Sequence, residues 1–367
     1  MKAFGELFID ETKKGIKLQT MEYKKQGSHI IVDQGKNQIA GYTDIKKGLF
    51  EDVPVIIFGD HTRVIKYVDQ PFFLGADGVK ILRSKDKNAN YKYLYYALRN
   101  ANIPDTGYNR HFKWLKETKI NYPSVARQDE IVRILDKLSD IIDRRKTQLQ
   151  GLDSLIKARF VEMFGDCSNM VLLNDLCLII TDGTHQPPKF QEKGIPFILV
   201  SNLSNNTVTY NTEKYISEET YNELYKRTPI EPGDLLLSTV GSYGHPAVVT
   251  EDIRFLFQRH IAYLRPKREL VNSFYLHSAL LAPDGQRQIE EKVKGIAQKT
   301  LNLSEIRKIM IPLPKMEEQD KFAAFVHQVD KSKLLSLIKL LEQLITYLYN
   351  VFIIYRQDKG EEVERYE

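Results

Sequence analysis

The sequence is poor in cysteine and has no long apolar run. Its two cysteines, Cys167 and Cys177, are too few for a disulfide framework, which favours a cytoplasmic protein with buried thiols. No stretch reaches the roughly 18 consecutive apolar residues that cross a membrane. The amino-terminal segment MKAFGELFIDETKK also lacks the apolar centre of a signal peptide. We therefore expect a protein with no membrane attachment.

The motifs of several enzyme classes are missing too. There is no GxxxxGK[ST] phosphate loop, and the two glycines of residues 240–244 are typical of a turn after a strand. The string QPPK at residues 186–189 lacks the Asn and the aromatic residue of a base methyltransferase tetrad. The histidines show no paired metal-ligand spacing. We therefore predict no catalytic site, no metal site and no cofactor site in this chain.

The net charge narrows the range of possible functions only slightly. The 53 basic and 48 acidic residues give a net charge of +5, a mild excess that permits a nucleic-acid partner without requiring one. The 42% of hydrophobic residues is normal for a globular chain, and 367 residues leave room for two or three domains.

The clearest pattern is a long amphipathic helix predicted from Gln128 to Phe164. Apolar residues recur at steps of three and four, from Ile131 to Phe164, and charged residues fill the other faces. Such a helix would be about 55 Å long. Its stripe covers one side only, so it needs a second long helix to lie against. A long helix of an ordinary bundle is the alternative interpretation.

A second stretch, residues 319–355, repeats the first. A proline-containing breaker precedes each helix, and Gln128-Asp129 matches Gln319-Asp320. Upstream, YLYYAL from Tyr93 matches YLHSAL from Tyr275. This spacing of about 190 residues indicates a duplicated domain rather than a solenoid repeat.

The sequence therefore predicts an α+β protein with a pseudo-twofold internal repeat. Two similar globular α/β domains would be separated by two long antiparallel coiled-coil helices. The predicted parts are globular residues 1–122, a helix over 123–165, globular residues 166–314, a helix over 315–355, and a charged, disordered tail over 356–367. Gly165 is expected to end the first long helix. Short helices are predicted at Tyr91–Arg99, Ser273–Leu281 and residues 218–225, and strands at 29–32, 53–58, 64–68, 79–82, 195–200, 234–239, 247–250 and 260–264.

Polar, aromatic and basic loops remain as candidate binding elements, because Arg, Lys, Asn and Gln are common readers of bases and phosphates. Taken singly, each of these residues can also be interpreted as part of an ordinary solvated turn rather than as a contact to DNA. The candidates for DNA binding are Lys36, Asn37, Tyr42, Thr43, His61, Thr62, Arg63, Asn109, Arg110, Thr184, His185, Lys189, Asn202, Ser238, Thr239, Ser242, Tyr243, Gln258 and Arg259.

With the repeat in view, the chain resembles the specificity subunit of type I restriction–modification systems. The two strings INYPSVARQDEI from Ile120 and IPLPKMEEQDKF from Ile311 resemble the boundary that leads into each long helix of that family. Further similarity lies in DGTH from Asp182, in GIPF from Gly194, and in IEPGDLLLSTVGSYG from Ile230. In the first domain, GYTD from Gly41 and VIIFGD from Val55 resemble another class of its target-recognition domains.

The resemblance implies a non-catalytic, cytoplasmic DNA-recognition subunit. Each target-recognition domain would bind one half of a bipartite double-stranded DNA site, and the helices would set the gap between the halves. Partners would be two modification (methyltransferase) subunits and restriction/translocase subunits. S-adenosylmethionine, ATP and Mg would belong to those partners.

Two other functions remain open at this point. One is a nuclease or a fused restriction–modification enzyme, which should carry the catalytic motifs that this sequence lacks. The other is a coiled-coil scaffold protein that does not bind DNA.

Overall fold

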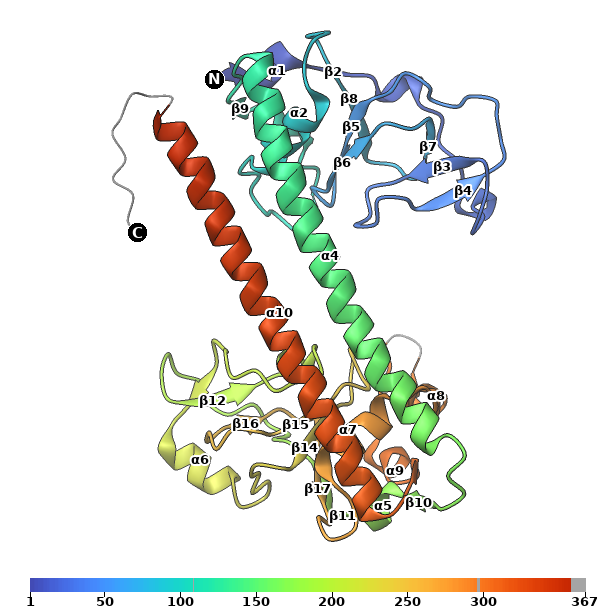
Figure 1. Cartoon of the computed structure of the whole chain (residues 1–367), viewed down its shortest axis with the longest axis vertical. Coiled ribbons are helices and arrows are strands. Elements are labelled where there is room, and N and C mark those ends of the chain that lie inside the picture. The colour runs from blue at the N-terminus through green and yellow to red at the C-terminus, as the bar shows by residue number, and fades with distance from the viewer. Residues whose placement is uncertain (108, 296–297, 358–367) are drawn as a thin grey trace. The chain divides into compact units, whose positions relative to one another are not determined.

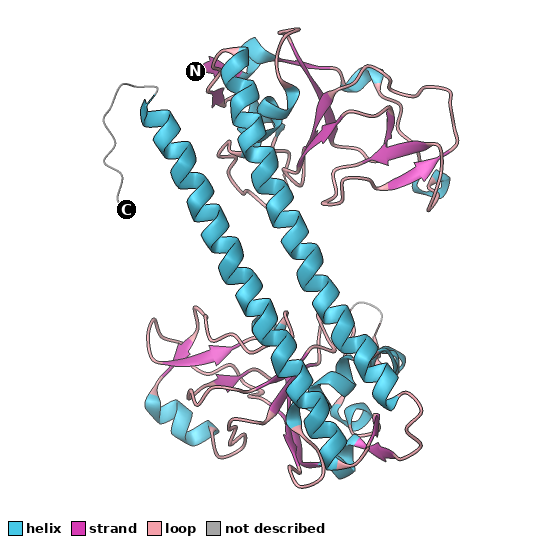
Figure 2. Cartoon of the chain, viewed as in Figure 1, coloured by secondary structure: helices cyan, strands magenta, loops and turns pink. Residues whose placement is uncertain are grey.

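The computed structural model describes residues 1–107, 109–295 and 298–357, and it divides into two compact units (Figure 1). The first unit comprises Met1–Ile141 and the end of the last helix from Asn350, and the second comprises Ile142–Tyr349. Both units combine short strands, short helices and long connections (Figure 2).

The first unit is built in chain order from β1 (Lys2–Ala3), α1 (Phe4–Leu7), β2 (Phe8–Asp10), η1 (Thr12–Lys14), η2 (Thr20–Glu22), β3 (His29–Val32), β4 (Gly41–Thr43), β5 (Val55–Gly59), β6 (Ile65–Val68), β7 (Phe72–Leu74), β8 (Val79–Ser84), α2 (Tyr91–Arg99), α3 (Phe112–Lys116) and β9 (Lys119–Ile120). The long helix α4 (Val125–Phe164) follows.

The second unit contains β10 (Met170–Leu172), α5 (Leu173–Leu176), β11 (Cys177–Asp182), β12 (Ile195–Ile198), η3 (Val200–Leu203), β13 (Tyr215–Ile216), α6 (Glu218–Leu224), β14 (Leu235–Ser238), β15 (Pro246–Val248), β16 (Leu256–Phe257), β17 (Ile261–Pro266), α7 (Ser273–Leu281), α8 (Pro283–Lys292), α9 (Leu303–Ile306) and β18 (Met310–Pro312). The long helix α10 (Met316–Gln357) completes it.

The two units share one topology. The first has a four-stranded sheet in the order β2-β8-β5-β6, and the second has β11-β17-β14-β15 in the same relative order. The three-stranded sheets β4-β3-β7 and β13-β12-β16 correspond in the same way, including one parallel pair in each. The two-stranded pairs β1-β9 and β10-β18 complete the correspondence. The predicted α+β class and internal repeat are confirmed. Among the described residues, helices α6 and α8 of the second unit have no counterpart in the first.

Each four-stranded sheet is buried because its central strands are apolar on both faces. All five residues of β5 and all four of β14 are buried. Such continuous apolar runs are typical of strands covered on both sides. The helices α2 and α7 each contribute a buried tyrosine and leucines to the adjoining cores.

A buried glutamine joins each long helix to the short helix of its own unit. In the first unit Gln128 Oε1 accepts the Asn90 N–H at 3.1 Å, and Gln128 Nε2 donates to the Pro123 carbonyl at 3.0 Å. In the second unit Gln319 makes the same bonds to Asn272 and Pro314, at 2.9 and 3.0 Å. Buried polar groups need such partners, so these bonds fix where α4 and α10 begin relative to α2 and α7.

Within the second unit the end of α4 lies antiparallel against α10, as Figure 1 shows. Phe160 and Phe164 pack edge-to-face against Phe322, with ring centroids 5.4 and 5.6 Å apart. Farther along, Asp153 pairs with Lys333 at 2.7 Å. From the first of these contacts to the last, the residue numbers decrease in α4 and increase in α10, so the two helices run in opposite directions. This confirms the predicted antiparallel contact of the two long helices.

Several predicted elements have matching bounds. The helices predicted at Tyr91–Arg99 and Ser273–Leu281 are α2 and α7. Helix α4 ends at Phe164, directly before Gly165, as expected of a glycine that follows the last apolar residue. Helix α10 extends to Gln357, two residues into the disordered tail predicted over 356–367, and residues 358–367 lie outside the described residues.

Candidate nucleic-acid interface

Four connections of the first unit lie beside one another. We call them the first loop row, made of residues 33–38, 60–63, 75–78 and the described part of 105–111. Gln34 is its centre: Gln34 Nε2 donates to the Asp77 carbonyl at 3.0 Å, and Thr62 Oγ1 donates to the Gln34 carbonyl at 2.6 Å. The Asp60 N–H donates to the Gly78 carbonyl at 2.7 Å. The row therefore brings together loops that follow different strands.

The last connection of this row is held by both backbone and side-chain bonds. The His111 N–H donates to the Asp60 carbonyl at 2.8 Å, and the Phe112 N–H donates to the Asp60 carboxylate at 2.7 Å. Arg63 also pairs with Asp105 at 2.5 Å. Because these bonds fix the backbone of the row, its exposed side chains project from defined positions.

The second unit has the corresponding arrangement, the second loop row, made of residues 184–189, 239–244, 258–260 and 298–300. The Arg259 N–H donates to the Thr184 carbonyl at 3.1 Å, and the Thr239 N–H donates to the His260 carbonyl at 2.9 Å. The Gly241 N–H donates to the Lys299 carbonyl at 3.2 Å. The bond between Thr239 and His260 is the counterpart of the one between Asp60 and Gly78.

The structure brings most of the predicted residues into the two rows. In the first row lie Lys36, Asn37, His61, Thr62, Arg63, Asn109 and Arg110. In the second lie Thr184, His185, Lys189, Thr239, Ser242, Tyr243, Gln258 and Arg259. Of these, the side chains exposed to solvent are Lys36, Asn37, Thr62, Asn109, Arg110, His185, Lys189, Ser242 and Arg259.

Four predicted residues are buried, which argues against direct contact with DNA. Asn202 is 7% exposed, and its amide accepts from the Leu199 N–H and donates to the carbonyls of Thr209 and Asn211. Ser238 is fully buried and accepts the His245 N–H at 3.0 Å. Thr239 is also buried. The sequence could not reveal this, because polar residues in a loop motif can equally hold the loop together.

Thr43, the fourth buried residue, lies with Tyr42 in strand β4, outside the first loop row. The Thr43 hydroxyl accepts the Ile45 N–H at 3.3 Å, and the Tyr42 backbone bonds to Lys24. Both residues therefore belong to the edge of the three-stranded sheet. We do not include them in the interface.

Lys299, which the sequence analysis did not select, belongs to the second loop row. Lys299 Nζ lies 2.9 Å from the Glu290 carboxylate and 3.2 Å from the Tyr243 hydroxyl. These partners raise the pKa of Lys299, mainly through the hydrogen bond to Glu290. Its position in the sequence could have identified it. Lys299 precedes the helix Leu303–Ile306, as Asn109 and Arg110 precede the corresponding helix α3 of the first unit.

His260 lies in the middle of the second row. Partial burial is the larger cause that lowers the pKa of His260, and the neighbouring Arg259 guanidinium lowers it further. Arg259 Nε donates to His260 Nε2 at 3.3 Å. An imidazole that accepts at Nε2 carries its proton on Nδ1, so this ring can offer one donor.

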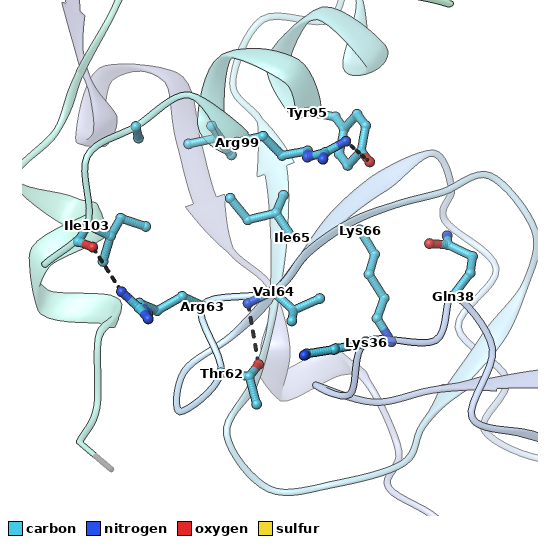
Figure 3. A pocket seen from close by; sticks show the side chains of 12 residues that line it. Lys36, Gln38, Thr62, Arg63, Val64, Ile65, Lys66, Tyr95, Arg99 and Ile103 are labelled. Atoms are coloured by element: carbon cyan, nitrogen blue, oxygen red, sulfur yellow. Dashed lines mark hydrogen bonds between the residues drawn. The ribbon is translucent and has the colours of Figure 1, made fainter. Parts of the chain in front are cut away.

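Each row borders a concave surface. In the second unit a cavity of about 520 Å³ is lined by residues 183–189 and by α6, and Arg227 on its wall pairs with Asp182 at 2.7 Å. In the first unit a groove, also of about 520 Å³, is lined by Lys36, Gln38, Thr62, Arg63, Val64, Ile65, Lys66, Tyr95, Leu98, Arg99, Ala101 and Ile103 (Figure 3). We call the latter the basic groove.

Two searches of the described residues bear on other kinds of site. In that part of the chain, no group of three or more His, Cys, Asp or Glu side chains is placed to hold a metal ion. Across the same residues, no helix combines the length and apolarity needed to cross a membrane.

The fold and its loops thus define a class of protein: a duplicated pair of α+β units, each with a row of polar loops, joined to two long helices in contact. Residues 2–153 and 168–346 match the family model described as "Type I restriction modification DNA specificity domain". The chain belongs to the family of type I restriction–modification DNA specificity subunits, which are the non-catalytic subunits of the complex. The predicted resemblance is confirmed.

Individual relatives agree with this assignment. The chain is 27% identical over 322 residues to the EcoBI specificity subunit of Escherichia coli, a match that covers 76% of this chain and 66% of the relative. It is 25% identical over 361 residues to the EcoR124I/EcoR124II specificity subunit of Escherichia coli, covering 89% and 85% of the two chains. The crystal structure of a type I S subunit from M. genitalium has the same fold, with a TM-score of 0.51, 16% identity, and coverage of 94% and 93%.

Proposed function

We propose that this chain binds a bipartite double-stranded DNA target through its two loop rows, one row for each half-site. In this proposal residues 1–122 and 166–314 are the two target-recognition domains. The observation that carries it is the repetition of one row of loops on one topology with different side chains. The first row presents Asn109 and Arg110, where the second presents Lys299.

Different side chains on one scaffold are what reading two different half-sites requires. Arg and Lys bond guanine O6 and N7, Asn and Gln bond adenine, and Ser or Thr bond either. Exposed residues of these types lie in both rows, with Asn109 and Arg110 in the first and Lys189 and Arg259 in the second. A loop that is already fixed loses less conformational entropy on binding than a mobile loop. The backbone hydrogen bonds within each row therefore favour binding.

The long helices would set the gap between the half-sites. Helices α4 and α10 have 40 and 42 residues, which corresponds to roughly 60 Å at about 1.5 Å per residue. DNA rises about 3.4 Å per base pair, so helices of this length span roughly 18 base pairs, which is enough to bridge half-sites centred roughly one helical turn apart.

An exposed apolar face of α10 is suited to contact with partner subunits. Leu334, Leu337, Ile338, Leu341 and Ile345 follow a spacing of three and four and are 42–66% exposed. The side of α10 toward α4 carries other residues, such as Ser336, which bonds Gln148 at 3.2 Å. A second apolar stripe on a helix that already has one neighbour is suited to a further helix.

We assign that stripe to modification (methyltransferase) subunits, two per complex, which would in turn hold restriction/translocase subunits. S-adenosylmethionine, ATP and Mg would be bound by those partners, and the complex would act in the cytoplasm, where the DNA is.

The decisive experiment expresses the chain with its modification subunit and sequences the methylated DNA. We expect one split motif with a fixed gap. Exchanging residues 1–122 for those of another family member should change one half of the motif and leave the other half unchanged. A single undivided motif, or loss of complex assembly with unaltered methylation, would contradict the proposal.

A further inference from the structure

The basic groove of the first unit lies between three elements: the connection after β3, the strand β6 with its preceding turn, and the helix α2. Figure 3 shows Lys36, Arg63, Lys66 and Arg99 around it. Cations gathered in a concave surface focus a positive potential there.

Two of these cations are engaged within the unit. Lys66, only 2% exposed, lies 3.3 Å from the Asp33 carboxylate and donates to the Asn37 carbonyl at 2.5 Å. Arg63 pairs with Asp105 at 2.5 Å and donates to the Ile103 carbonyl. These two cations shape the walls of the groove, and each is balanced by a carboxylate.

The other two cations give the groove its excess charge. Arg99 is exposed, its Nη1 donates to the Tyr95 hydroxyl at 3.0 Å, and its guanidinium lies 5.4 Å from the centre of the Tyr95 ring. Lys36 is exposed on the loop opposite. Within the described part of the chain neither pairs with a carboxylate, so the groove has two cations to offer to an external anion.

The second unit shows that the fold does not require this charge. In the second unit the cavity beside α7 is lined by Asp153 and Lys157 of α4, Asp330 and Lys333 of α10, and His277 and Leu281 of α7, among others. Lys333 lies 2.7 Å from Asp153 and 2.8 Å from Asp330. By the matching of α2 with α7, Leu281 stands where the first unit has Arg99. The position of Arg99 is thus apolar in the second unit, so the two copies of the fold differ in charge at the end of this helix.

We infer that the basic groove grips a phosphate of the DNA backbone beside the half-site bound by the first unit, independently of base sequence. This inference rests on the proposed function. The groove shares Lys36, Thr62 and Arg63 with the first loop row, so a duplex read by that row brings its backbone to the groove. Guanidinium and ammonium groups on long stems suit phosphate oxygens.

The inference also assigns unequal roles to the units. The first supplies base reading and a sequence-independent grip, whereas the second, which has Leu281 at the position of Arg99, supplies base reading without this grip. Affinity for any duplex should therefore depend on Lys36 and Arg99.

The test uses the complex of the full chain with its modification subunit, and two duplexes, one with the methylated motif and one with scrambled half-sites. Binding is measured by fluorescence anisotropy over a series of NaCl concentrations. The variants are Arg99→Leu, which installs the residue of the second unit, and Lys36→Gln. The matched control is Lys87→Gln, an exposed lysine outside the groove and the loop rows.

We expect each groove variant to weaken binding of both duplexes by the same factor and to reduce the slope of log K against log salt by about one. The double variant should reduce the slope by about two, and the methylated motif should not change. Thermal unfolding of each variant is compared with that of the original chain, so that loss of folding is recognised.

Two results would overturn the inference. Unchanged slopes in folded variants would show that no phosphate is held there, and a loss confined to the motif duplex would show that these cations read bases. A complex that prefers neither duplex before any substitution would instead contradict the proposed function.

Discussion

Gln128 and Gln319 occupy the same place in the two units and make the same pair of hydrogen bonds. Each accepts the N–H of an asparagine that caps a short helix, and each donates to a proline carbonyl before a long helix. Both side chains are fully buried. The glutamine that recurs in the sequence five residues after proline is thus a joint between helix and domain.

Replacing this joint should destabilise the second unit. In Gln319→Ala the Asn272 N–H and the Pro314 carbonyl lose their buried partner, which costs about 1–3 kcal/mol for such a group. We expect a lower midpoint in urea unfolding followed by circular dichroism. Gln150→Ala, at an exposed position of α4, should leave the midpoint unchanged, and an equal effect of both substitutions would refute the role of the joint.

Stability should depend on Glu11 in a pH-sensitive way. Burial alone raises the pKa of Glu11, but hydrogen bonds from Lys14 and Arg83 outweigh it and hold the pKa below its ordinary value of 4.5. A carboxylate with a lowered folded pKa stabilises the fold above its unfolded pKa, and this contribution is lost as pH falls through the folded pKa.

Glu11→Gln should therefore lower the free energy of unfolding at pH 7 more than at the acid end of the curve, below the ordinary pKa of 4.5. Unfolding in urea across this pH range measures the difference. Glu117→Gln, at an exposed position, serves as the control. A constant difference between Glu11→Gln and the original chain across the range would show that Glu11 does not act through its charge.

The exposed stripe of α10 should be needed for assembly and not for folding. Leu337 and Leu341 are 42% and 59% exposed, so Leu337→Asp with Leu341→Asp removes little buried surface from this chain. We expect thermal unfolding to change little and the complex with the modification subunit to be lost in size-exclusion chromatography. Lys339→Asp, on another face of the same helix, should assemble normally. An intact complex of the double variant would place the partner elsewhere.

The second loop row should read only its own half-site. Arg259 is exposed, and Arg259→Ala is expected to cost about 1–3 kcal/mol of binding when the second half-site is correct. Substituted bases in that half-site should then matter less, while those in the first half-site should matter as before. Binding to a panel of duplexes measures this. Arg254→Ala removes a surface arginine that pairs with Glu218 and should change neither preference.

Local patterns predicted the two long helices, the helices α2, α6 and α7, and most of the longer strands. The six-residue strand β11 was not predicted. Helix α2 and helix α7 have the predicted bounds because a run with helical periodicity begins after an asparagine that can cap it. The strands β4, β7 and β16 were not predicted, since two or three residues carry too little alternation. Helix α8 was missed as well, because its sequence PDGQRQIEEK is mostly polar and buries only Gly285, Gln288 and Ile289.

The candidate site was predicted in part. The motif around Ser238 and Thr239 indicated a loop of interest, yet both side chains are buried and serve the loop itself. Lys299 and Arg99 were not selected, because no motif includes Arg99 and only the position of Lys299 before the helix Leu303–Ile306 marks it. Their significance depends on Tyr243 and Lys36, which lie far away in sequence.

The sequence by itself determined the duplication, the α+β class and the two long helices, because repetition and helical periodicity are properties of neighbouring residues. Only the tertiary structure decided which loops stand side by side, which polar residues are buried, and that Lys36 and Arg99 meet in a basic groove of the first unit. Those facts follow from pairing between distant strands, such as β3 with β7 and β12 with β16, which no local pattern specifies.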